Sequence, residues 1–161
     1  MEQTALKMRD TAVNSLQEDR QHWMSVMAKS SSELVTRLSA THVDSTEFET
    51  IRAPEVGLTQ VRARMGGTGS EFNLGDMTLC RCVVRSQAGH YGYSYIAGRN
   101  KAHARRAAEL DALLQSEAHR PLLRQQVIAP LEGVLLEEQQ HKTAETRATK
   151  VNFFTLVRGE D

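Results

Sequence analysis

The sequence is poor in the residue types that mark several specialised protein classes. Its 161 residues include two cysteines, three prolines and one tryptophan, and aromatic residues make up 5% of the chain. So few cysteines exclude a disulfide-rich secreted scaffold. Cys80 and Cys82 are two residues apart, so they would share one face of a strand and are poorly placed to bond to each other. We therefore expect two reduced thiols in a cytoplasmic protein.

An excess of one charge sign is also missing, because 20 Lys and Arg residues balance 20 Asp and Glu residues. Nucleic-acid binders normally carry a basic excess, so we expect no nucleic-acid partner. The sequence has no apolar run as long as a membrane span and no apolar signal region near its start, so we expect no membrane association. A neutral chain is weakly protected against association, which suits a protein that works inside a complex.

Familiar catalytic and nucleotide-binding motifs are absent as well. The sequence contains no G-x-x-x-x-G-K-[ST], no G-x-S-x-G and no H-E-x-x-H. Its glycine-rich stretch lacks the G-x-G-x-x-G spacing and precedes a strand-like segment, which argues against a dinucleotide fold. Two cysteines supply only half of a tetrahedral zinc site, so we expect no metal. On these grounds we assign no catalytic residue and no cofactor.

The first third of the chain has the periodicity of amphipathic helices. Trp23, Val26 and Met27 recur at i, i+3 and i+4 in a helix that we expect to begin near Asp19. Large apolar residues at this spacing are core or interface anchors, and Trp23 is our first candidate for partner contact.

A second short helix should follow, with Ser31 or Ser32 as its N-cap. Residues 1–18 are mostly polar, and we expect them to form an N-terminal extension that is mobile or ordered by a partner. The remaining residues, 19–161, should form a single domain.

From Thr46 the apolar period changes to two, which predicts strands. We expect a first strand that ends near Pro54, followed by strands over Leu58–Met65, Met77–Arg85 and Tyr91–Ala97. Short connections between successive strands indicate an antiparallel arrangement. The predicted fold class is therefore α+β: an antiparallel four-stranded β-meander with N-terminal helices and long C-terminal helices packed on it.

The C-terminal helices should begin at Asn100, a suitable N-cap. A further helix should start with Pro130 in its first turn and reach about Ala148. The first of these helices carries an apolar stripe that we expect to lie on the sheet, formed by His103, Ala107, Leu110 and Leu114.

The glycine-rich stretch is the first candidate binding site. Four of the ten glycines fall between positions 66 and 75. Successive backbone N–H groups there would form an anion-binding nest, with arginine supplying charge. The alternative is a glycine-rich turn between two strands, which composition alone favours. The candidate anion-binding or interface residues are Arg62, Arg64, Gly66, Gly67, Thr68, Gly69 and Asp76.

The start of the helix after Asn100 is the second candidate. Cations at a helix N-terminus oppose the helix dipole, by about 0.3–1 kcal/mol each when exposed. A bound anion or an acidic partner surface would reverse this cost. The alternative is a solvated basic face relieved by Glu109. The candidates here are Arg99, Lys101 and His103, with Arg105 and Arg106 beside them.

The chain closes with an apolar segment that needs burial, either on its own sheet or as a strand added to a partner. We expect residues 151–161 to form an interaction tail, with partner contacts from Phe153, Phe154, Leu156, Val157 and Arg158.

Several of these segments, in order, resemble the PhnG family of the bacterial carbon–phosphorus lyase core complex. The resemblance runs from about residue 20 to the C-terminus and leaves residues 1–18 outside. It is carried by Arg20-Gln-His-Trp-Met-Ser-Val26, Ala63-Arg-Met-Gly-Gly-Thr-Gly69 with Gly75-Asp76, Gly92-Tyr-Ser-Tyr95, Gly98-Arg-Asn-Lys-x-His-Ala104, Asp111-Ala-Leu113 and Val151-x-Phe-Phe-Thr-x-Val-Arg-Gly159.

The resemblance implies a non-autonomous subunit of a phosphonate-degrading complex. Family members belong to a two-fold symmetric core with PhnH-, PhnI- and PhnJ-like subunits, and PhnL- or PhnK-like ATP-binding proteins join them. With PhnH, PhnI and PhnL they are needed to transfer the ribose triphosphate of MgATP to methylphosphonate, with release of adenine. MgATP is then a substrate of the whole complex, and PhnG needs no cofactor of its own.

Two other functions fit the residues. A self-contained phosphoester-binding enzyme would use His103 with the arginines near Gly66–Gly69. A purely structural assembly clamp would use the glycines as turns and the tail as a contact.

Overall fold

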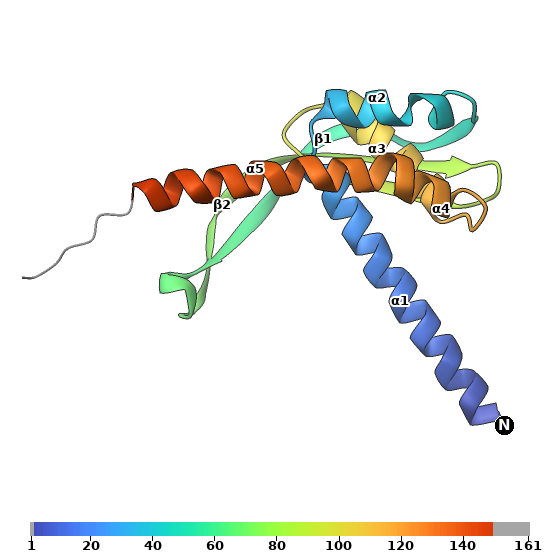
Figure 1. Cartoon of the computed structure of the whole chain (residues 1–161), viewed down its shortest axis with the longest axis horizontal. Helices are drawn as coiled ribbons and strands as arrows, with labels where there is room; N and C mark the ends of the chain where they lie inside the picture. Colours follow the sequence, from blue (N-terminus) through green and yellow to red (C-terminus); the bar gives the residue numbers. More distant parts are fainter. Residues whose placement is uncertain (1, 150–161) are drawn as a thin grey trace, which may run out of the picture.

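The computed structural model describes the backbone of residues 2–149 and the side chains of residues 16–149. The predicted tail, residues 151–161, therefore lies outside the described residues. In the described chain, α-helices precede and follow a single β-sheet (Figure 1). Its elements are α1 (Glu2–Lys29), α2 (Ser32–Val43), β1 (Phe48–Arg64), β2 (Glu71–Ser86), β3 (Tyr91–Ala97), α3 (Lys101–Leu114), α4 (Arg120–Leu123) and α5 (Ala129–Ala148).

The sheet is antiparallel with strand order β1-β2-β3. The α+β class is as expected, but the prediction of four strands is wrong. One long strand, β1, replaces the first two predicted strands and runs straight through Pro54. Its register against β2 shifts between Thr50 and Arg52 and again between Arg52 and Glu55. Because β1 is an edge strand with bulges at this point, a proline without an N–H costs it little pairing.

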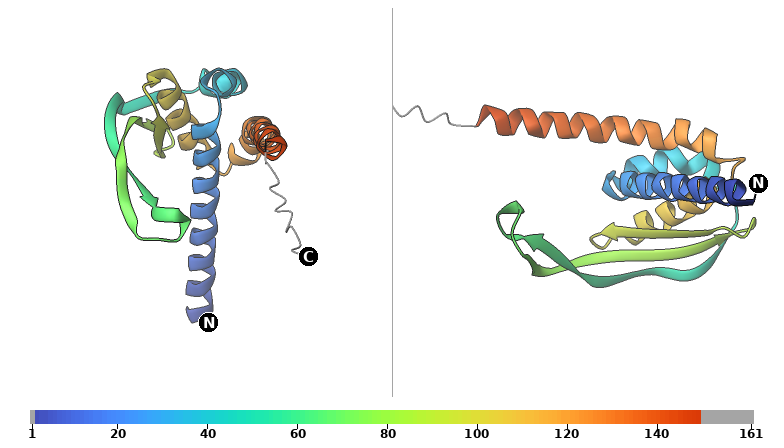
Figure 2. Two further views of the ribbon diagram at one scale, coloured as in Figure 1. Left: turned by 90° about the vertical axis from the view of Figure 1, so that its left-hand side faces the viewer. Right: turned by 90° about the horizontal axis from the view of Figure 1, so that it is seen from below.

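The core lies between the sheet and the helices, which cover one face of the sheet (Figure 2). The predicted stripe of α3 is fully inside it, since His103, Ala107, Leu110 and Leu114 are all buried. Cys80, Cys82, Val84 and Ile96 meet this stripe from β2 and β3. The two cysteines are buried free thiols, as expected from their spacing.

Local signals in the sequence explain several helix boundaries. The hydroxyl of Ser31 accepts from the N–H of Leu34 at 3.3 Å and caps α2. The side chain of Asn100 accepts from the N–H of His103 at 2.9 Å and caps α3. Pro130 lies in the first turn of α5 as expected. The helix expected to begin near Asp19 is instead part of α1, which is continuous from Glu2.

Two elements project from the body on the same side (Figures 1 and 2). One is the C-terminal half of α5. The other is the part of the β1–β2 hairpin that lies beyond the end of β3, residues 57–78, which we call the arm. No residue of the arm is buried. Among the described residues, no helix is both long and apolar enough to cross a membrane.

Candidate functional site

The glycine-rich stretch forms the tip of the arm. Met65–Gly67 make a short 3-10 turn in which Gly66 and Gly67 have φ of 59° and 83°. These positive angles favour glycine for backbone reasons alone. Arg64 pairs with Glu71 at 2.6 Å, and Arg62 reaches the same carboxylate at 3.5 Å. The tip is thus a strand-to-strand connection whose arginines already have a counter-charge.

The basic side chains at the start of α3 lie in different environments. Arg105 pairs with Glu109 at 2.9 Å, and Arg106 pairs with Asp44 at 2.7 Å. His103 turns into the core, while Arg99 and Lys101 are exposed. Much of the local cationic charge is therefore offset within the chain.

The structure keeps the two predicted anion sites apart. Gly98 closes β3 by donating its N–H to the carbonyl of Thr78 at 2.8 Å, which places the start of α3 at the base of the arm. Glu71 lies seven residues before Thr78 in β2, a distance of about 23 Å at the rise of an extended strand. Within one chain, a single small anion does not reach both Arg64 and Lys101.

His103 has a structural role in this arrangement. Its side chain is buried, and its Nε2–H donates to the carbonyl of Met27 at 3.0 Å, so it links α3 to α1. Burial lowers the pKa of His103, and the hydrogen bond to Met27 opposes that shift only in part. The N–H of the neutral imidazole donates to this carbonyl, and the ring points away from the surface.

A buried carboxylate organises a cluster of residues from α1, α3 and β3. Asp111 is 0% exposed and accepts from the Trp23 indole at 2.9 Å and from the N–H of Tyr93 at 2.9 Å. Arg20 binds both of its oxygens, at 3.1 and 2.6 Å, and lies 5.5 Å from the Tyr93 ring centroid. Trp23 is therefore a core anchor of the described chain and lies below its surface.

This Asp111 cluster also occupies the start of the free edge of β3. The N–H of Tyr93 is taken by Asp111, and the carbonyl of Tyr91 accepts from Arg20 and Gln115. An edge strand whose polar groups are occupied by side chains is a poor template for a further strand. The cluster holds α1, α3 and β3 together and leaves no free group for chemistry.

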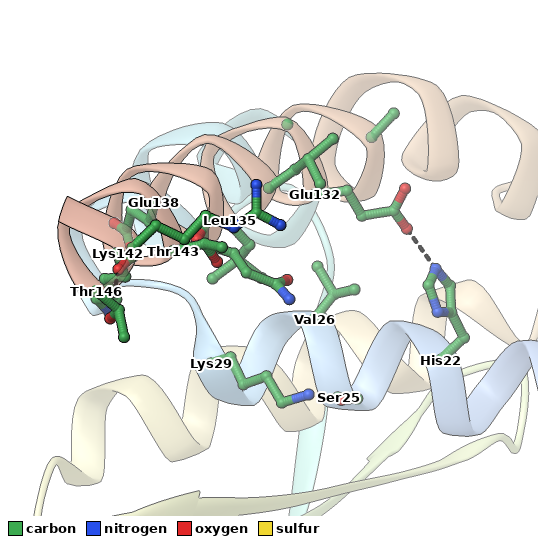
Figure 3. A pocket seen from close by; sticks show the side chains of 15 residues that line it. His22, Ser25, Val26, Lys29, Glu132, Leu135, Glu138, Lys142, Thr143 and Thr146 are labelled. Atoms are coloured by element: carbon green, nitrogen blue, oxygen red, sulfur yellow. Dashed lines mark hydrogen bonds and ion pairs between the residues drawn. The ribbon is translucent and has the colours of Figure 1, made fainter. Parts of the chain in front are cut away.

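A groove of about 1280 Å³ lies between α1 and α5. Val26 and Leu135 face into it (Figure 3). One end is closed by His22, whose Nε2 lies 2.6 Å from a carboxylate oxygen of Glu132. Lys29 and Lys142 stand at the other end. The groove is larger than a usual small-molecule pocket, and its walls are two helix faces.

Catalytic or metal-binding chemistry finds no support in the described residues. They contain no group of three His, Cys, Asp or Glu side chains placed to hold a metal ion. Burial raises the pKa of both Cys80 and Cys82, which makes them less reactive as nucleophiles. Asp76 lies on the exposed arm.

Two features escaped the sequence analysis. Asp111 could have been noticed because it lies four and three residues after Ala107 and Ala108 and so interrupts an otherwise apolar helix face, all of it buried. The exposure of the arm had no local signal. Phe72 and Leu74 were assigned to the glycine-rich connection, whereas β2 in fact begins at Glu71, and Met77 was the first residue of a predicted strand.

The sequence is similar to known proteins of phosphonate metabolism. Residues 18–159 match the family model described as "Phosphonate metabolism protein PhnG". A protein from Rhizobium meliloti (strain 1021), described as "Alpha-D-ribose 1-methylphosphonate 5-triphosphate synthase subunit PhnG", is 47% identical over 121 residues. The match covers 73% of this chain and 75% of that protein.

Proposed function

Because the chain belongs to the PhnG family, we propose that it is a non-autonomous subunit of a phosphonate-degrading synthase. The observation that carries the proposal is the match over residues 18–159, supported by the 47% identity to a protein named as a synthase subunit. The reaction is transfer of the ribose triphosphate of ATP to methylphosphonate, with release of adenine. The partners are PhnH-, PhnI- and PhnJ-like subunits with PhnL- or PhnK-like ATP-binding proteins, and the site of action is the cytoplasm.

The geometry supports a subunit role over a self-contained enzyme. His103 is buried and hydrogen-bonded, and Arg62 and Arg64 share the carboxylate of Glu71. The exposed apolar arm instead has the character of a surface that another protein covers. We assign no cofactor to the chain itself, and MgATP enters as substrate of the assembled complex.

Reconstitution tests the proposal. The chain is co-expressed with the subunits encoded beside its gene, purified by a tag on the chain, and assayed for adenine released from ATP in the presence of methylphosphonate. We expect co-purification, turnover by the complex, no turnover by the folded chain alone, and none by the complex prepared without the chain. Robust turnover by the chain alone would show that it is a self-contained enzyme.

The same preparation separates a clamp from an anion-binding subunit. Arg64→Ala and Lys101→Ala change exposed side chains at the arm tip and the start of α3. For a clamp, both variants retain adenine release whenever the complex assembles. A loss of activity in a fully assembled Arg64→Ala or Lys101→Ala complex would instead place a substrate anion at that residue.

A further inference from the structure

The sheet leaves one face open. The helices of the described chain lie on the face that carries Cys80, Cys82 and Ile96 (Figure 2). Side chains alternate along a strand, so the opposite face carries Leu79, Arg81 and Val83 from β2. Their partners across the register are Ala97, Tyr95 and Tyr93, and Tyr91 follows opposite Arg85. We call this surface the outer face; its tyrosines are 37–52% exposed.

The apolar side of the arm continues the outer face. Met77 lies two residues before Leu79 and pairs with Thr59, so both belong to that face. Val61 pairs with Gly75 but Arg62 pairs with Asn73, which makes Leu74 the extra residue of a bulge. The bulge restores the alternation, so Ala63 and Phe72 again share the side of Thr59 and Met77. Arg62, Arg64 and Glu71 fall on the opposite, polar side.

A two-stranded arm of this kind gains little stability from its own contacts. Hairpins without a third strand or a packed face are marginally stable in water. This arm extends 22 residues, 57–78, without one buried side chain. Phe72, Leu74 and Met77 are 42%, 64% and 39% exposed. Exposed apolar groups concentrated on one projecting element mark an interaction surface.

The charges on the outer face are largely paired among themselves. Arg81 bonds Glu55 at 2.6 Å, and Arg85 lies 3.8 Å from Glu49 and 5.6 Å from the Tyr91 ring centroid. Such a surface offers little free charge to a nucleic acid or an anionic membrane. Tyrosine, methionine and phenylalanine are the residues enriched at the centres of protein interfaces.

We propose that the outer face, from Tyr91, Tyr93 and Tyr95 to Phe72 and Met77 on the arm, is the surface on which another subunit of the complex packs an apolar, uncharged layer. The inference rests on the proposed function and specifies which surface performs it.

A different subunit fits this surface better than a second copy of the chain. Arg52, Arg81 and Arg85 outnumber Glu49 and Glu55 on the outer face, so two copies stacked face to face would bring together equal positive excesses. Sheet extension at the start of β3 is hindered, because Asp111 accepts from the N–H of Tyr93 while Arg20 and Gln115 donate to the carbonyl of Tyr91. A partner with an apolar, uncharged layer meets neither obstacle.

The test uses charged substitutions in the full chain, co-expressed with the other subunits. Phe72→Glu and Tyr95→Glu place a charge on the outer face, one on the arm and one on the three-stranded part of the sheet. The matched control is Leu136→Glu, which changes a 56% exposed leucine in the groove between α1 and α5. All three positions are exposed, so each variant should fold, and circular dichroism with thermal unfolding checks this.

We expect Phe72→Glu and Tyr95→Glu to weaken assembly by about tenfold or more, and Leu136→Glu to assemble like the parent chain. Hydrogen exchange of amides 57–78 should slow in the complex. Normal assembly of both outer-face variants, or loss of assembly with Leu136→Glu alone, overturns the inference while the proposed function stands. A parent chain that joins none of the co-expressed subunits overturns both.

Two further outcomes would identify another occupant and also overturn the inference. Light scattering of the chain alone would reveal a dimer that Phe72→Glu dissociates if a second copy covers the face. Co-sedimentation with phosphatidylcholine vesicles that Phe72→Glu abolishes would indicate a lipid surface. We expect neither.

Discussion

Asp111 connects three elements through one carboxylate. It accepts hydrogen bonds from Arg20 and Trp23 on α1 and from the backbone of β3, and its side chain is 0% exposed. Asp111→Asn would remove the charge that Arg20 pairs with and present an amide N–H₂ where only acceptors fit. Removing one partner of a buried ion pair costs about 3–5 kcal/mol, so we expect a loss of that order in the free energy of unfolding, measured by urea denaturation.

The control is Asp44→Asn, which breaks an ion pair of the same type at the surface. Asp44 pairs with Arg106 at 2.7 Å, but its side chain is 62% exposed. Exposed pairs contribute about 0–1 kcal/mol, so this variant should unfold almost like the parent chain. Equal destabilisation by the two substitutions would show that the Asp111 cluster does not join the elements energetically.

His103 makes stability depend on pH in a defined window. Its pKa in the folded chain lies below the ordinary value of 6.5, because burial disfavours the imidazolium. Below pH 6.5 the unfolded state therefore binds more protons than the folded state, and stability falls as the pH decreases. Above that value the contribution is fully present.

His103→Gln keeps an N–H donor toward Met27 and removes this titration. Between pH 6.5 and more acidic conditions, the parent should lose up to about 1.4 kcal/mol per pH unit more than the variant. Urea denaturation at several pH values from neutral to mildly acidic measures the two slopes. Parallel slopes would mean that His103 is not kept neutral by burial.

At the scale of elements, Gly92 sets the distance between β3 and α3. A Cβ built there would lie 1.9 Å from the carbonyl oxygen of Ala108 and 2.7 Å from the N of Ala112. Both are backbone atoms of a helix and cannot turn aside. Gly92→Ala must therefore separate strand and helix, and we expect a loss of about 1–3 kcal/mol or more in thermal unfolding.

Gly57 in β1 provides the matched substitution, because a Cβ there would meet nothing within 4 Å. Gly57→Ala should leave stability unchanged or raise it slightly by restricting the unfolded chain. If both alanine variants unfold at the same temperature, the close approach of β3 to α3 does not constrain this fold.

The elements also show how far the sequence could predict the fold. The spacing of apolar residues was sufficient to predict the buried stripe of α3. Capping chemistry was sufficient to predict helix starts near Ser31 and at Asn100. Both signals depend on neighbours within one or two helical turns. Pro54 misled the prediction, because its meaning depends on whether the strand is central or at an edge. Whether a strand is central or at an edge depends on the whole sheet, and the residues near Pro54 do not reveal it.

The candidate sites likewise combine local features, which the sequence could predict, with features that depend on distant contacts, which it could not. The glycine turn at Gly66 and Gly67 was predictable, since positive φ is a local property. The pairing of Arg64 with Glu71, the burial of His103 and the open outer face arise from contacts between distant elements. Periodicity predicted the strand over Tyr91–Ala97 but carried no information on which of its faces helices would cover.

At the scale of the whole molecule, the balance of charge predicts how the assembly responds to salt. The outer face is apolar and its ion pairs are internal, whereas the groove between α1 and α5 carries Lys29 and Lys142 at one end. Salt screens contacts between exposed charges and leaves apolar contacts intact. If the outer face holds the chain in the complex, raising NaCl from about 0.15 M to about 1 M should leave its dissociation rate nearly unchanged. Surface-immobilised complex measures this rate directly, and release of the chain at high salt would instead assign the main contact to the basic end of the groove.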